Sequence, residues 1–146
     1  MNPNQSHYTV AELVQRIDTG ELTVNRKYQR SPKVWPETAR SFLVETVILG
    51  FPVPKLMLWE RTNVDTLKTK REIVDGQQRT FAIYDYIKGK YALSNTVETD
   101  EIRGKLFQEL DVGSKTRLVT YALGVDLLVG SEEAEVRDIF RRLNSY

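Results

Sequence analysis

Apolar residues recur every three to four positions in the first half of the chain, the spacing that gathers side chains on one face of a helix. The first such stretch opens with Thr9 and Glu12, a capping-box pair, and stops at Gly20. The second, residues 37–49, follows Pro36, which suits the first position of a helix. Two helices are therefore predicted before residue 50.

Three more helices are predicted in the second half of the chain. One begins near Gln77 and stops at Gly89. A short one is expected from Ser114, as its capping residue, to position 121. The last follows Gly130 and Ser131, which break and cap, and keeps helical spacing through its apolar residues Val136, Ile139, Phe140 and Leu143.

Short apolar runs between these helices predict strands at residues 21–25, 55–60, 71–74 and 123–129. Residues 26–35 and 61–70 are polar connections, and residues 90–103 lack regular spacing, so loop or partial disorder is expected there. The alternation predicts an α/β domain in which a small mixed sheet is flanked by helices.

Composition excludes several kinds of chemistry. The 146 residues carry a net charge of +1, so a nucleic-acid contact would have to be local. Without cysteine there is no thiolate nucleophile or disulfide framework, and His7 is the single histidine, near a start expected to be mobile. No apolar run is long enough to span a membrane and no signal pattern precedes it, so no membrane partner and a cytoplasmic location are expected.

The most informative segment joins the strand at residues 71–74 to the helix near residue 77. It supplies Asp75, Gly76, Gln77, Gln78 and Arg79 to a helix N-terminus, which favours anions such as phosphate. Arg79 could hold phosphate in a fork, and Asp75 could bind a magnesium ion or a ribose hydroxyl. The alternative is a plain strand-to-helix turn in which Asp75 is the N-cap.

A second polar cluster lies in the loop before Trp35. Arg26 and Arg30 alternate there with Tyr28 and Gln29, which suits phosphate and base contacts, although charged loops are most often only solvated. Val53 and Pro54 fit a rigid connector. Arg141 and Asn144 fit a helix C-terminus.

The order of these clusters resembles the N-terminal DUF262 domain of bacterial anti-phage defence proteins, a family of the ParB/sulfiredoxin-like superfamily. The resemblance rests on three segments and on Trp35: residues 28–30, residues 73–79 and residues 139–144. The family includes GmrSD-type modification-dependent restriction enzymes and SspE-type sensors of phosphorothioate DNA.

The resemblance implies a ParB/sulfiredoxin-like core that binds and hydrolyses a nucleoside triphosphate (GTP, CTP or UTP) with Mg²⁺ while recognising modified DNA. By matching position, residues 75–79 form the implied nucleotide site. In the mechanism expected for it, Asp75, Gln78 and Arg79 are the catalytic residues, with Asp75 holding Mg²⁺ and Gln78 orienting the attacking water. Nucleotide would be bound by Arg26, Arg30, Gly76, Gln77, Arg141 and Asn144. The phosphorothioate or base modification would be bound by Tyr28, Gln29, Val53 and Pro54.

Three functions stay open at this point: a nucleoside triphosphatase that senses DNA, a binding module without turnover such as a ParB-like clamp, and a reader of modified DNA. Relatives carry a C-terminal HNH-type nuclease domain that needs histidine and metal, so this chain is not expected to cleave DNA. Its end directly after a strong helix predicts a longer parent protein. The sequence leaves a homodimer open.

Overall fold

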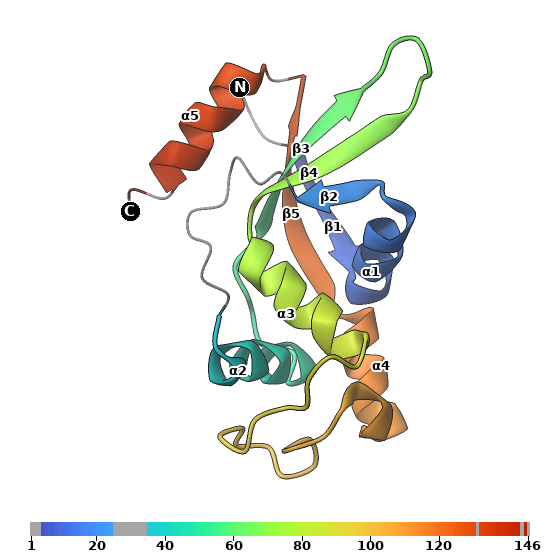
Figure 1. Cartoon of the computed structure of the whole chain (residues 1–146), viewed down its shortest axis with the longest axis vertical. Helices are drawn as coiled ribbons and strands as arrows, with labels where there is room; N and C mark the ends of the chain where they lie inside the picture. Colours follow the sequence, from blue (N-terminus) through green and yellow to red (C-terminus); the bar gives the residue numbers. More distant parts are fainter. Residues whose placement is uncertain (1–3, 25–34, 131, 144, 146) are drawn as a thin grey trace.

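The computed structural model describes residues 4–24, 35–130, 132–143 and 145. Its centre is one five-stranded mixed sheet in the order β1-β5-β3-β4-β2 (Figure 1). The strands are β1 Asn4–Thr9, β2 Leu22–Val24, β3 Leu56–Thr62, β4 Thr69–Asp75 and β5 Ala122–Val129. β3 is antiparallel to β4 and parallel to β5, whereas β2 is parallel to β4 and β1 is antiparallel to β5. The predicted α/β class with a small mixed sheet is confirmed.

In the described part of the chain, four helices cover one face of this sheet, and one helix covers the other. They are α1 Val10–Thr19, α2 Glu37–Ile48, α3 Gln77–Ile87, α4 Val112–Thr120 and α5 Glu133–Leu143, with a short 3-10 turn η2 Phe107–Glu109. The first four contribute Leu13, Val47, Ile83 and Leu118 to the main core. α5 packs through Val136 on a smaller cluster, and Figure 1 shows it apart from the other helices.

Strand alternation explains why two cores form. Leu58 and Ile73 face the main core, while their chain neighbours Trp59 and Val74 face α5. The two faces therefore bury different residues of the same strands, and both strands are apolar on each side.

Local signals placed most elements correctly. Thr9 and Glu12 form the predicted capping box, and Gly20 ends α1 in the left-handed conformation. Pro36 lies one position earlier than predicted, at the N-cap of α2 rather than inside it. The predicted cap of α4 is wrong: Asp111 is the N-cap, and its carboxylate accepts from the N–H and the hydroxyl of Ser114.

Two segments differ from expectation. Strand β1 is not evident in the sequence, because its six residues are mostly polar and exposed, and only pairing with β5 makes them a strand. Residues 90–103 are irregular as predicted but packed rather than disordered, since Tyr91, Leu93 and Ile102 are buried. The Tyr91 hydroxyl donates to the Ala82 carbonyl at 2.5 Å, which fixes this loop on α3.

Among the helices that the described residues form, none has the length and apolarity to cross a membrane.

Candidate functional site

The end of β4 is irregular where it enters the predicted site. Leu58 pairs with Ile73, but the preceding residue of β3, Met57, pairs with Asp75, so Val74 is an extra residue in the ladder. Such a bulge bends a strand and redirects the side chains that follow it. Asp75 is the last residue of β4, next to the start of α3, and its side chain is 39% exposed.

Gly76 makes the turn from β4 into α3. It is the N-cap residue, with φ +102°, and no side chain caps the helix. A Cβ atom at this position would lie 2.4 Å from Cδ2 of Leu56, which is itself buried. A glycine is therefore required here for both conformation and space. The alternative in which Asp75 is a simple N-cap is wrong.

Arg79 contacts residues from two other parts of the site. Its Nη2 donates to the main-chain carbonyl of Lys55 at 2.9 Å and lies 3.6 Å from the carboxylate of Asp75. The Arg79 side chain is 17% exposed, and its Nε is buried without a hydrogen-bond partner among the described residues. The same is true of Nε in Arg16 and Arg40, so this unpaired donor does not identify a ligand by itself.

The two glutamines of the turn have different surroundings. Gln77 is buried, and its Nε2 donates to the carbonyls of Ile73 at 3.4 Å and Val74 at 3.3 Å, across the bulge. Gln78 is half-buried, and its Oε1 accepts from the main-chain N–H of Trp35 at 3.1 Å. Gln77 holds the turn on β4, and Gln78 holds the chain that precedes α2.

Apolar side chains pack closely beside Arg79 and leave no space for a water molecule between them. They are Val53 and Leu56 together with Leu43, Ile83 and Leu123, with Thr80 at their edge. Val53 and Arg79, predicted for two different ligands, thus lie in one packed region, whereas Pro54 is exposed. Thr80 is buried and its hydroxyl donates to the Gly76 carbonyl at 2.9 Å, which stiffens the turn.

The remaining predicted residues are distributed as follows. Arg141 is exposed on α5, where its guanidinium pairs with Asp138 at 2.6 Å. Arg26, Tyr28, Gln29, Arg30 and Asn144 lie outside the described residues. The described residues on either side of 25–34 both contact elements of the site. Val24 pairs with Ile73 of β4, and the main-chain N–H of Trp35 donates to Gln78.

Lys55 is the site residue that sequence reasoning missed. It contributes a main-chain carbonyl, which no side-chain pattern reveals, from 24 positions before Arg79. No described group of three or more His, Cys, Asp or Glu residues could hold a metal ion. Asp75 alone therefore suits only a cation that keeps waters and phosphate oxygens as its other ligands, as Mg²⁺ does.

The arrangement combines a fixed guanidinium, a half-exposed carboxylate and the positive end of α3 around a glycine, and it is suited to holding a phosphate. In comparisons with known proteins, no curated protein and no solved structure matches the chain significantly. A family model described as "GmrSD restriction endonuclease, N-terminal domain" matches residues 10–146. The chain accordingly belongs to the family of GmrSD restriction endonuclease N-terminal domains.

Proposed function

We propose that this domain binds a nucleoside triphosphate at the turn from Asp75 to Arg79 and hydrolyses it as the sensor part of a DNA-modification-dependent restriction protein. The observation that carries the proposal is the position of Arg79. Its guanidinium is held by the Lys55 carbonyl and by Asp75 at the start of α3, next to a glycine. A guanidinium fixed in this way loses little conformational freedom when it binds a phosphate.

Each residue of the turn would have one task. Gly76 would let phosphate oxygens approach the main chain, and Arg79 would neutralise their charge with the helix dipole. Asp75 would hold Mg²⁺, which supplies electrostatic stabilisation of the transferring phosphoryl group. Arg26 and Arg30 would add phosphate contacts from the segment that starts after Val24, and Arg141 and Asn144 would contribute from the end of the chain.

One observation favours the second candidate, a binding module with little turnover. Hydrolysis requires a residue that orients the attacking water, the task that the expected mechanism assigns to Gln78. The side-chain oxygen of Gln78 accepts from Trp35, while Gln77 is buried on β4. Turnover would therefore use a second acceptor site on the Gln78 oxygen or a group from elsewhere.

The DNA part of the proposal rests on the family. A restriction protein acts on DNA, and its C-terminal HNH-type nuclease domain would lie beyond this chain. In this proposal Tyr28 and Gln29 join Val53 and Pro54 in a partly apolar pocket for a phosphorothioate or modified base. The supporting observation is that Val53 packs in the same region as Arg79, because weakly hydrated sulfur favours an apolar wall beside a phosphate contact.

The test measures triphosphate binding and phosphate release separately, with GTP, CTP and UTP and with Mg²⁺. Arg79→Lys should weaken binding about 10- to 100-fold, because a lysine cannot keep the fork and the Lys55 contact together. Asp75→Asn should abolish Mg²⁺-dependent release and leave Mg²⁺-free binding intact or tighter, since it removes a negative charge.

Arg103→Lys is the matched control. Arg103 also donates to main-chain carbonyls, of Val97 and Glu98, and pairs with Asp100, yet it lies in the loop before η2. It should change neither binding nor release. Binding without phosphate release by the parent chain would establish the module without turnover, and undiminished triphosphate binding by Arg79→Lys would reject the site.

A further inference from the structure

The hairpin of β3 and β4 extends beyond the body of the domain, as the long green arm of Figure 1 shows. Its outer part pairs Arg61 with Lys70 and Thr62 with Thr69. Residues 63–68 form the tip, and all ten residues from 61 to 70 are exposed. The main core lies elsewhere, so this arm does not contribute to it.

The arm concentrates positive charge. Residues 61–70 contain the cations Arg61, Lys68 and Lys70 and the single anion Asp65, which sums to +2, whereas the whole chain carries +1. Arg61 pairs with Glu72 and stacks over Trp59 at 4.2 Å. Among the described residues, the side chains of Lys68 and Lys70 form no ion pair, so their charges face solvent.

A hollow of about 470 Å³ lies on this arm. Every residue that lines it is basic or a neutral hydrogen-bonding residue: Arg61, Thr62, Asn63, Thr66, Lys68 and Lys70. No carboxylate lines the hollow in the part of the chain that the structure describes, so its surface fits an anion such as a phosphate of a nucleic-acid backbone.

The tip has a fixed shape. Asn63 Oδ1 accepts from the N–H groups of Asp65 at 2.9 Å and Thr66 at 3.1 Å, and the Asn63 carbonyl accepts from Leu67 at 2.8 Å. The N–H of Lys68 donates to the Thr66 hydroxyl at 3.3 Å. These bonds order the loop before any partner arrives, which lowers the entropic cost of binding.

Leu67 is the unusual residue of the tip. At φ +60° it is the one non-glycine residue with positive φ in the described part of the chain. A glycine would adopt this conformation without strain. Leu67 is 78% exposed and Val64 is 83% exposed, so neither is explained by burial in the fold.

We propose that the β3–β4 arm is a contact site for duplex DNA, with Lys68 and Lys70 on backbone phosphates and Leu67 and Val64 in the groove between them. A two-stranded ribbon fits the major groove, and apolar side chains at the tips of DNA-binding elements contact base edges or enter between base steps. The choice of DNA as partner rests on the proposed function in restriction, while the surface itself is argued from the arm alone.

The arm and the nucleotide site occupy opposite ends of β4. Thr69 begins the strand at the tip, and Asp75 ends it at the turn. Six strand intervals span about 20 Å, so substitutions at the tip leave Arg79 and its partners untouched. The two proposals can therefore fail independently.

Fluorescence anisotropy with a labelled duplex tests the arm, with one unmodified probe and one phosphorothioate probe of the same sequence, each with and without triphosphate. Lys68→Gln/Lys70→Gln should weaken binding at least about fivefold at moderate salt. It should also lower the slope of log affinity against log salt by about 2, because two phosphate contacts are lost. Triphosphate binding should not change.

Leu67→Gly separates folding from recognition. Because glycine suits the positive φ, the variant should be at least as stable as the parent in urea unfolding. Its affinity for the duplex should nevertheless fall by roughly three- to tenfold, since the groove contact is gone.

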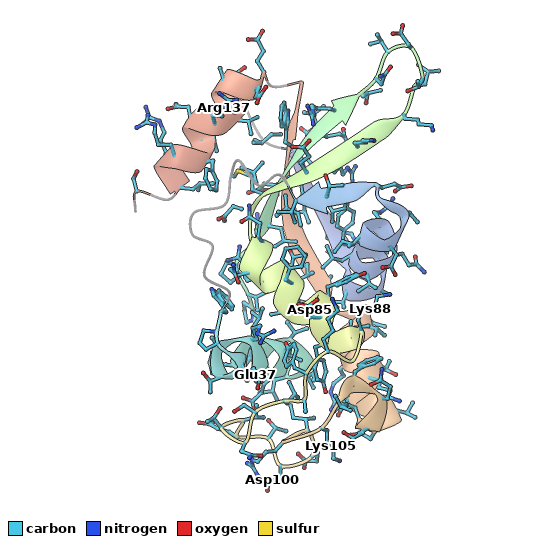
Figure 2. The ribbon with its side chains drawn as sticks, in the orientation of Figure 1. Glu37, Asp85, Lys88, Asp100, Lys105 and Arg137 are labelled. Atoms are coloured by element: carbon cyan, nitrogen blue, oxygen red, sulfur yellow. The ribbon has the colours of Figure 1, made fainter. Side chains whose placement is uncertain are left out.

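The control removes the same charge elsewhere. Lys105→Gln/Lys115→Gln acts at the opposite end of the molecule, where Lys105 is labelled in Figure 2 and Lys115 lies on α4. It should leave affinity and salt slope unchanged. The proposal is overturned if the arm variants bind both probes as tightly as the parent, or if the parent binds neither probe. Failure of Arg79→Lys to alter triphosphate binding would instead overturn the nucleotide site and leave the arm standing.

Discussion

The side-chain oxygen of Gln78 accepts a hydrogen bond from the main-chain N–H of Trp35, 43 positions earlier, at 3.1 Å. This bond joins the first turn of α3 to the residue that follows the basic segment 25–34. The segment is preceded by Val24, which pairs with Ile73 two residues before Asp75. The described residues that flank the chain carrying Arg26 and Arg30 therefore both contact the elements of the turn that the sequence predicts to bind phosphate.

Gln78→Ala should release Trp35 and lower the free energy of unfolding by about 1 kcal/mol, because a half-buried N–H loses its acceptor. Amide hydrogen exchange at Trp35 should accelerate. Gln78→Glu keeps an acceptor oxygen and should preserve slow exchange at Trp35, but its negative charge should weaken triphosphate binding. Unchanged exchange in Gln78→Ala would contradict the anchoring role.

Gly76→Ala should be among the most damaging single-methyl changes in the chain. The residue has φ +102°, and its new Cβ would meet buried Leu56. A strained conformation costs about 1–2 kcal/mol, and overpacking adds a further ~1–2 kcal/mol. Urea unfolding measures the total.

Gly20→Ala provides the comparison for Gly76→Ala. Gly20 has a positive φ of +82°, but no atom lies within 4 Å of the place that a Cβ would occupy, so only the conformational cost should appear. Equal losses of unfolding free energy in the two variants would show that the Leu56 side chain moves aside without an energetic cost.

Asp18 should make the protein sensitive to acid. Hydrogen bonds from Lys88 at 2.7 Å and from the Tyr84 hydroxyl at 2.6 Å hold the pKa of the Asp18 carboxyl below its ordinary value of 3.8. A lowered pKa stabilises the fold above pH 3.8, and this contribution disappears as pH falls through the folded-state pKa. In Asp18→Asn, the free energy of unfolding should therefore fall less steeply as the pH is lowered.

The same cluster predicts an effect at alkaline pH. The hydrogen bond to Asp18 raises the pKa of Lys88 above 10.5 and that of Tyr84 above 10.0. These contributions are complete below those values and are lost as pH rises through the raised folded-state pKa values. Tyr84→Phe removes one of the two donors to Asp18. It should therefore reduce the acid-dependent loss of unfolding free energy only in part. The account would be refuted if the free energy of unfolding of Asp18→Asn followed the same pH dependence as that of the parent at both acid and alkaline pH.

α5 should unfold locally more easily than the other helices. It packs through Val136, with Ile139 and Phe140, on Trp59, Val74 and Leu128. Val136→Ala should cost on the order of 1–2 kcal/mol and accelerate amide exchange through residues 133–143, with little effect in α1 to α4.

Arg137→Ala tests the opposite side of the same helix. Arg137, labelled in Figure 2, is exposed and pairs with Glu133, one turn earlier. Such surface pairs contribute about 0.3–0.5 kcal/mol, so exchange should change little. Acceleration across the whole domain in Val136→Ala would show that α5 is part of one cooperative unit with the main core.

Several elements followed from the sequence because their signals are local. The capping box of Thr9 and Glu12, the stop at Gly20 and the amphipathic spacing around Val136 act within one or two turns of chain. The glycine between Asp75 and Arg79 likewise identifies a strand-to-helix turn without knowledge of its conformation. The family match over residues 10–146 agrees with the resemblance drawn from these motifs.

Other features were decided only by tertiary structure. β1 is a strand because it forms hydrogen bonds with β5. The bulge at Val74 exists because the register between β3 and β4 shifts between Met57 and Leu58. Arg79 is fixed by a carbonyl 24 residues away and Gln78 by an N–H 43 residues away. Side-chain types and spacing along the chain carry short-range preferences, but they do not specify which distant main-chain groups meet. The sequence by itself determined that a carboxylate, a glycine, two amides and a guanidinium occupy one strand-to-helix turn, and folding determined which of their atoms are already bound.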